Sequence, residues 1–95
     1  MGKLDKLARL AAEYYEVPFE KLKGRCRGQV CTVPRHFCYW VACDAGYKKA
    51  TIAKYWGVDR SSVHYGVKIV TAKIRSRKHE EEELKRFLRF LKDHL

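Results

Sequence analysis

Apolar residues recur every three or four positions along most of the chain, and charged or polar residues fill the positions between them. This spacing places the apolar side chains on one face of a helix, so it predicts amphipathic α-helices. No stretch has the strict alternation of a half-buried strand, and no apolar run approaches the length that spans a membrane. We therefore expect an all-α fold, a compact multi-helix domain.

Proline and glycine divide the chain into helical segments. Val17 precedes Pro18 and so avoids helical geometry, which ends a first helix. Gly24, Gly46 and Gly57 suit the ends of later helices, because glycine adopts the left-handed conformation found there. The predicted helices span residues 3–16, 19–23, 34–45, 50–56, 59 to about 75, and 79–95.

The predicted core consists of the apolar residues that share a face within each of these segments. Trp40 and Trp56 are both expected inside it, where each indole N–H needs a partner. Phe90 lies off the apolar face of the last helix. The full predicted set is Leu4, Leu7, Leu10, Ala11, Tyr14, Phe19, Leu22, Phe37, Trp40, Val41, Ile52, Trp56, Val63, Val67, Val70, Leu84, Phe87, Leu88 and Leu91.

The stretch from Lys49 to Ile69 predicts a helix-turn-helix, with Gly57-Val58 as the turn. Asp59 is expected at the N-cap, where its side chain can accept a hydrogen bond from the amide of Ser61 or Ser62. Arg60, Ser61 and Ser62 then occupy the first turn of the second helix, where a recognition helix meets base edges and phosphates. The alternative is a structural corner between two helices with no role in binding DNA.

Charge favours nucleic acid as the partner. The net charge is +10 at pH 7 and the pI is about 9.7, so we expect an acidic partner. Residues 21–35 carry five Lys or Arg and no acid, and residues 48–78 carry nine against Asp59 alone. The first of these segments includes Gly24–Val33, expected as a mobile basic loop that could place an arginine in a minor groove. The second contains the predicted helix-turn-helix.

The cysteines do not predict a metal site. Cys26, Cys31, Cys38 and Cys43 lack the tight C-x2-C spacing of zinc knuckles. We expect them to be buried or half-buried free thiols that bind no metal, and we expect no cofactor. Ninety-five residues suffice for one small domain, residues 1–95. Nothing resembles a signal peptide, so a cytoplasmic location is expected, on the nucleoid when bound to DNA.

Several motifs in order along the chain resemble the C-terminal DNA-binding domain (domain IV) of the bacterial replication initiator DnaA. That family's hallmark has the form I-G-x-x-F-G-x-R-D-H-S-T-V, and the matching stretch here begins I-A-K-Y-W-G-V-D-R-S-S-V. A-E-Y-Y near the N-terminus is similar to the family's first-helix motif, and K-G-R-C-R-G before V-P-R resembles its basic loop. Arg60 stands where the family has histidine and Ser62 where it usually has threonine. The segment after Gly57 is one residue shorter.

The resemblance implies a fold built around a helix-turn-helix, as in Trp repressor, and sequence-specific binding of duplex DNA. It assigns major-groove contacts to Asp59, Arg60, Ser61 and Ser62, and the minor-groove contact to the basic loop, with Arg27 the better match and Arg25 beside it. Phosphate contacts are expected from Arg35, Lys48, Lys49 and Lys54. It also implies a role in replication initiation or its regulation, with a replication initiator or another replication protein as a possible partner.

A second interpretation keeps this fold but makes it a protein-interaction module that contacts an initiator or a repressor instead of DNA. The acid-free basic segment favours DNA, whereas a cluster of exposed Tyr and Phe residues would favour a protein partner. We do not expect an enzyme, because no carboxylate pair or nucleophile–base set occurs at a useful spacing. No G-x-x-x-x-G-K-S/T loop is present, so no nucleotide is expected to bind.

Overall fold

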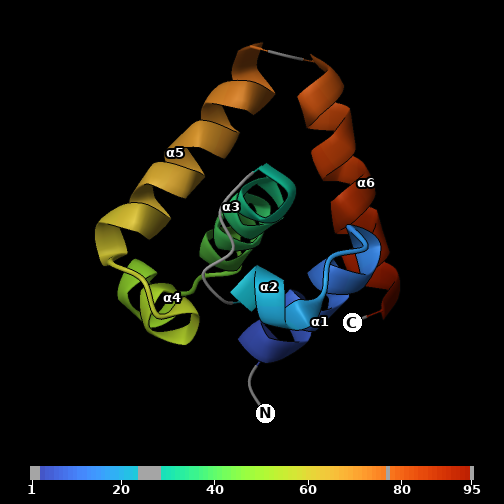
Figure 1. Ribbon diagram of the computed structural model, residues 1–95. Coiled ribbons are helices and arrows are strands. Elements are labelled where there is room, and N and C mark those ends of the chain that lie inside the picture. The colour runs from blue at the N-terminus through green and yellow to red at the C-terminus, as the bar shows by residue number, and fades with distance from the viewer. Residues whose placement is uncertain (1–2, 24–28, 77, 95) are drawn as a thin grey trace.

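The computed structural model describes residues 3–23, 29–76 and 78–94, which form helices joined by short turns (Figure 1). In chain order these are α1 (Lys3–Tyr14), α2 (Phe19–Lys23), α3 (Gln29–Asp44), α4 (Lys49–Trp56), α5 (Arg60–Ser76) and α6 (Lys78–His94). No strand occurs in these ranges. The all-α expectation is therefore confirmed, and α2 has the predicted bounds.

α3 lies at the centre of the arrangement. It contacts α1, α2, α4 and α5, and α6 closes the other side by packing on α1 and α5. In Figure 1, α5 and α6 converge at one end and diverge around α3, while α1, α2 and α4 lie at the open end. The largest fully buried side chains come from five of these helices: Leu22, Phe37, Ile52, Val63, Val70 and Phe87.

Most of the predicted core is buried, but α3 presents a different face from the one expected. Phe37 is buried as predicted, together with Cys38, Tyr39 and Ala42, whereas Trp40 and Val41 are only partly buried at the edge of the core. Phe90 also packs against the core, with its ring centroid 5.0 Å from that of Tyr14. Trp56 is buried as predicted, although its indole Nε1 has no hydrogen-bond partner among the described residues.

Three helices end in the same way, with a left-handed residue after the last turn. Glu16, Gly46 and Gly57 have φ values of 55°, 100° and 68°. In each case the next amide bonds back to a carbonyl five residues earlier, for instance Val58 N–H to the Ala53 carbonyl at 3.0 Å. This is the Schellman arrangement. α1 therefore ends at Tyr14, two residues earlier than predicted. Glu16 adopts the left-handed conformation that Gly46 and Gly57 adopt after α3 and α4.

The start of α3 contradicts the sequence prediction. Pro34 was expected to open this helix, but the helix begins at Gln29, so residues 29–33 of the predicted loop are helical. Cys31, Pro34 and Cys38 share one buried stripe. Burial of this stripe stabilises a helix that begins before Pro34. Arg35 reinforces it by donating from Nε to the Leu22 carbonyl at 2.8 Å. Residues 24–28 of the predicted loop lie outside the described residues.

The cysteines also differ from expectation in part. Cys31 is disulfide-bonded rather than a free thiol, whereas Cys38 is a buried free thiol and Cys43 a half-buried one. Burial raises the pKa of the Cys38 thiol, which keeps it protonated. Within the described ranges, no three His, Cys, Asp or Glu side chains group as metal ligands would. None of the helices described here has the length and apolar character needed to traverse a bilayer.

Candidate nucleic-acid interface

α4 and α5 are joined by the short turn Gly57-Val58-Asp59. Gly57 ends α4, and the main-chain carbonyl of Asp59 accepts hydrogen bonds from the amides of Ser62, at 3.0 Å, and Val63, at 3.4 Å. Asp59 therefore occupies the predicted N-cap position, and the Ser62 amide bonds its main chain rather than its carboxylate. Asp59, Arg60, Ser61 and Ser62 are all exposed at this end of α5.

Packing against α3 decides which face of α5 remains in solvent. Val63, Gly66 and Val70 are the buried residues of α5. A Cβ added to Gly66 would fall 2.8 Å from Cδ2 of both His36 and Tyr39, so the backbone of α5 lies directly against these two rings of α3. This close approach fixes the rotation of α5 about its axis, and with it the direction of every exposed side chain.

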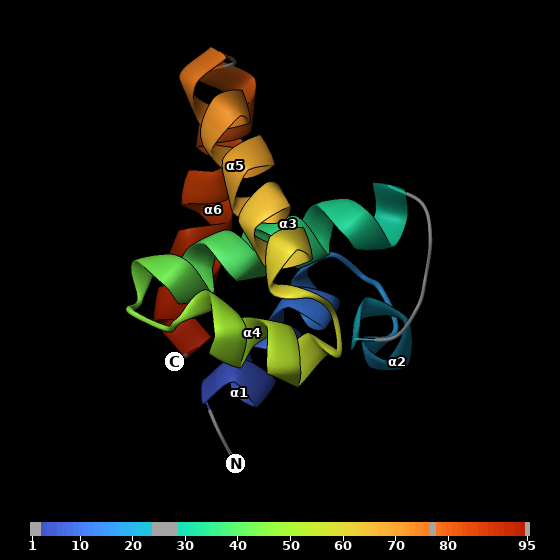
Figure 2. The same cartoon turned by 90° about the vertical axis from the view of Figure 1, so that its left-hand side faces the viewer.

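The exposed face of α5 carries a stripe of basic residues. At 100° per residue, Arg60, His64, Lys68 and Arg75 fall within a sector of about 80°, and all four are exposed. Figure 2 shows α5 rising from the α4 turn, so this stripe runs along its length. The sequence interpretation concentrated on the first turn and missed His64, Lys68 and Arg75. Their spacings of four and seven residues from one another are the signal that could have identified them.

A hollow between α4 and α5 brings five of the predicted site residues together. We name it the α4–α5 hollow; it is lined by Lys48, Lys49, Ala50, Asp59, Arg60, Ser61 and His64. His64 also lines this hollow although the sequence did not predict it as a site residue, and its Nδ1 lies 2.9 Å from Nζ of Lys49. Among the described residues of this lining, Asp59 is the acidic one and three are Lys or Arg, so the hollow suits a negatively charged ligand.

The same basic surface continues toward the C-terminal end of α5. A second hollow shares Lys49 and His64 with the first and adds Val67, Lys68, Thr71, Ala72 and Arg75. Lys49, Lys68 and Arg75 are the charged side chains there, and the Thr71 hydroxyl is already donated to the Val67 carbonyl at 2.9 Å. The cationic surface is therefore longer than the first helical turn.

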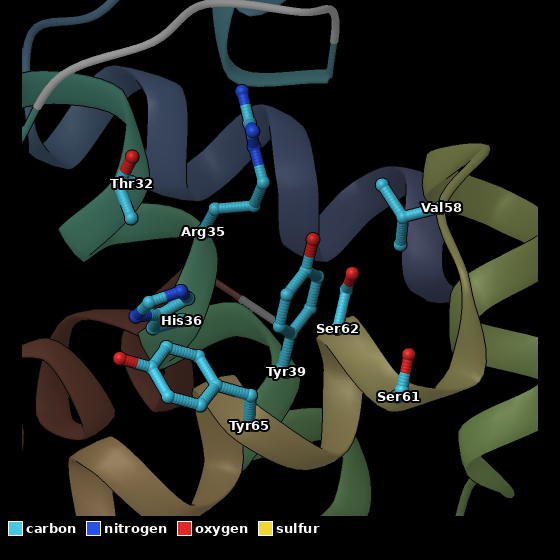
Figure 3. Close-up of a pocket in the computed structure, with 8 residues that line it drawn as sticks. All are labelled: Thr32, Arg35, His36, Tyr39, Val58, Ser61, Ser62 and Tyr65. Atoms are coloured by element: carbon cyan, nitrogen blue, oxygen red, sulfur yellow. The ribbon is translucent and has the colours of Figure 1, made fainter.

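A third hollow lies on the other side of the α5 N-terminus, and we name it the α3–α5 pocket (Figure 3). It encloses about 420 Å³ and is lined by Thr32, Arg35, His36, Tyr39, Val58, Ser61, Ser62 and Tyr65. Arg35 is part of this lining, but its Nε and Nη2 donate to the carbonyls of Leu22 and Lys21. Arg35 therefore also ties α3 to the end of α2.

His36 lines the same pocket from α3. Burial, followed by the positive charges of Lys73 and Arg35, lowers the pKa of this imidazole below its ordinary value of 6.5. The ring is therefore neutral at pH 7. Its centroid lies 6.1 Å from that of Tyr65, which is 59% exposed and packs edge-on against it.

The structure does not group Lys54 with these residues. Lys54 lines a hollow between α1 and α4 together with Lys3, Asp5 and Tyr55, among others. On this side the Tyr55 hydroxyl donates to Asp5 Oδ1 at 2.8 Å, which fastens α4 to α1. Hydrogen bonds from Arg9 and then from Tyr55 lower the pKa of the Asp5 carboxyl. The predicted minor-groove residues, Arg25 and Arg27, lie outside the described residues.

Among known proteins, no protein-family model matches this chain, and no curated sequence matches it either.

Proposed function

We propose that this chain binds duplex DNA in a sequence-specific manner through the exposed face of α5. The observation that carries the proposal is the exposure of Arg60, Ser61 and Ser62 at the start of α5, beside a basic stripe that runs along the same helix. The resemblance of the motifs to domain IV of DnaA extends the proposal to a role in replication initiation or its regulation.

The chemistry of these side chains suits the two kinds of DNA contact. An α-helix with its side chains is about 10–12 Å wide, which matches a major groove about 12 Å wide. Arg60 presents a planar fork of donors that can bond O6 and N7 of guanine. Ser61 and Ser62 can bond bases or phosphates, whereas Lys48, Lys49, Lys68 and Arg75 supply positive charge for the backbone.

One observation bears on the protein-interaction alternative. That alternative needs an exposed cluster of aromatic or other large apolar side chains. In the described part of the chain, Tyr65 is the large hydrophobic residue that is exposed. A single exposed tyrosine within a mainly polar and basic surface supports DNA more than a protein partner.

Selection of duplexes from a random pool tests the proposal directly. We expect the full chain to enrich one short asymmetric motif, and Arg60→Ala to enrich a degenerate version of it. Lys92→Ala, an exposed lysine on α6, serves as the matched control and should enrich the same motif as the wild-type chain. Retention of duplexes without any motif would reduce the activity to nonspecific binding, and no retention at all would exclude DNA binding.

A further inference from the structure

The α3–α5 pocket has an unusual chemical lining. Thr32, Tyr39, Ser61, Ser62 and Tyr65 contribute hydroxyl groups, His36 an imidazole and Arg35 a guanidinium, and none of the described lining residues carries a carboxylate. Hydroxyl groups donate hydrogen bonds readily, and an acceptor-only group such as a phosphate oxygen complements them. Arg35 contributes positive charge, because its guanidinium already donates to the Leu22 and Lys21 carbonyls. The pocket is therefore suited to an anion rather than to an apolar or cationic ligand.

Tyr39 is the most informative residue in this lining. Its side chain is only 2% exposed, and Figure 3 shows its hydroxyl pointing into the pocket, between Arg35 and Ser62. Its ring packs edge-on against Trp56, at 5.2 Å between centroids. Within the described residues, however, its hydroxyl makes no hydrogen bond. The oxygen stays accessible from the pocket, so a ligand bound there can accept the hydrogen bond that this hydroxyl does not make within the described residues.

The protonation state of Tyr39 suits the role of a donor. Burial raises the pKa of Tyr39 to about 12, although the charge of Arg35 acts in the opposite direction. The phenol therefore keeps its proton across the physiological range. The same pocket lies at the N-terminus of α5, a helix of 17 residues, where the helix dipole favours a negative charge.

We propose that the α3–α5 pocket receives one phosphate of the bound DNA strand, with the Tyr39 hydroxyl donating to a non-bridging oxygen of that phosphate. Ser61 and Ser62 border the pocket and can supply further hydroxyl donors to the same group. This inference rests on the proposed function, because the phosphate belongs to the duplex held by α5. It adds a contact on α3, a helix central to the core, so that the strand is positioned by a rigid element as well as by surface lysines.

Tyr39→Phe is a clean test, because it removes only the hydroxyl and keeps the buried ring. With a duplex obtained from the selection, we expect affinity to fall about 10-fold, as for the loss of a hydrogen bond to a charged group. The selected motif should be unchanged. The salt dependence of binding should also be unchanged, because a neutral hydroxyl displaces no counterion. The melting temperature of the free protein should stay about the same, because the buried ring is kept and the lost hydroxyl bonds no described residue.

A phosphate-by-phosphate scan locates the contact. Replacing one strand phosphate at a time with a neutral methylphosphonate should identify a position that weakens the wild-type chain but has little further effect on Tyr39→Phe. Tyr47→Phe is the matched control, because Tyr47 is half-buried and lines hollows on the α1 side of the molecule. It should bind all of these duplexes as the wild-type chain does.

The outcomes separate the inference from the proposed function. If the wild-type chain binds no duplex, both are overturned. If it binds a duplex and Tyr39→Phe binds equally well, only the phosphate contact is overturned. A lower melting temperature accompanied by strictly additive effects across the methylphosphonate scan would make Tyr39 a structural residue, and would also overturn the contact.

Discussion

Gly66 of α5 and His36 of α3 lie in direct contact, so close that a Cβ on the glycine would fall 2.8 Å from Cδ2 of the imidazole. The backbone of α5 thus packs against a ring that lines the α3–α5 pocket. Tyr39 Cδ2 would lie equally near that Cβ. One glycine therefore determines both the distance between these helices and the shape of the pocket beside the α5 N-terminus.

Gly66→Ala should destabilise the protein, even though alanine is the better helix former. The added methyl must displace two rings, one of them in the core, and overpacking of this kind costs about 1–3 kcal/mol. Thermal unfolding measures the effect. Lys68→Ala, on the exposed side of the same helix, should stay within about 0.5 kcal/mol of the wild-type value. Equal stability of Gly66→Ala and the wild-type chain would mean that α5 can move away from α3.

Glu16→Gly should stabilise the protein by about 0.5–1 kcal/mol, because Glu16 has a φ of 55° in the Schellman end of α1. Gly57→Ala should have the opposite effect at the end of α4, where φ is 68° and no atom of the described residues crowds the site. Chemical denaturation of both variants tests this pair. A loss of stability in Glu16→Gly would indicate that the glutamate side chain itself supports the turn.

Stability should decline as the pH falls from 7 to 5, in part because of His36. The pKa of His36 in the folded chain lies below its unfolded value of 6.5. As the pH falls below 6.5, the unfolded chain therefore binds a proton at this residue more readily than the folded chain does. The contribution is fully present above pH 6.5 and is lost progressively below it. Denaturation curves of the wild-type chain and His36→Gln across this range measure the effect, and the variant should show the shallower dependence. An imidazole titration by NMR with a midpoint above 6.5 would contradict the assignment.

Arg60→Ala should relax the sequence preference at one or two positions of the selected motif, at a cost of about 1–3 kcal/mol on the preferred site. Arg60 is exposed at the first position of α5, where it can reach base edges. Binding curves on the preferred duplex and on single-base variants measure the discrimination. A motif that remains sharp would reassign Arg60 to the phosphate backbone.

Binding to duplex DNA should depend strongly on salt, with a log–log slope near −4 to −5 if about five basic side chains neutralise phosphates. Lys68→Ala should weaken binding to all sequences about equally and should make the slope shallower by about one. Titrations at several salt concentrations measure both values. An unchanged slope would remove Lys68 from the proposed DNA contacts.

Helical periodicity was enough to predict most of the fold. The bounds of α2 and the burial of Leu4, Phe87 and Val63 follow from local spacing and from turn residues. The start of α3 did not follow, because the local rule places proline in the first turn of a helix. Tertiary contacts override that rule here, since Cys31 is buried and Arg35 bonds to α2.

The candidate site was predictable only where it depends on neighbouring residues in the sequence. Arg60, Ser61 and Ser62 were identified from the turn that precedes them, and they are exposed together. The α3–α5 pocket could not be predicted, because it depends on how closely α3 approaches α5 at Gly66. Tyr39 was not among the predicted core residues either, because α3 buries a different face from the one expected, with Tyr39 inside and Trp40 only partly buried.

The division of α5 into two faces has an evolutionary consequence. Its packing depends on Val63, Gly66 and Val70, whereas Arg60, Ser61 and His64 face solvent. Substitutions on the solvent side of a helix usually change stability little. Descendants of this sequence could therefore acquire a new ligand preference through single substitutions on that face, with no compensating change in the core.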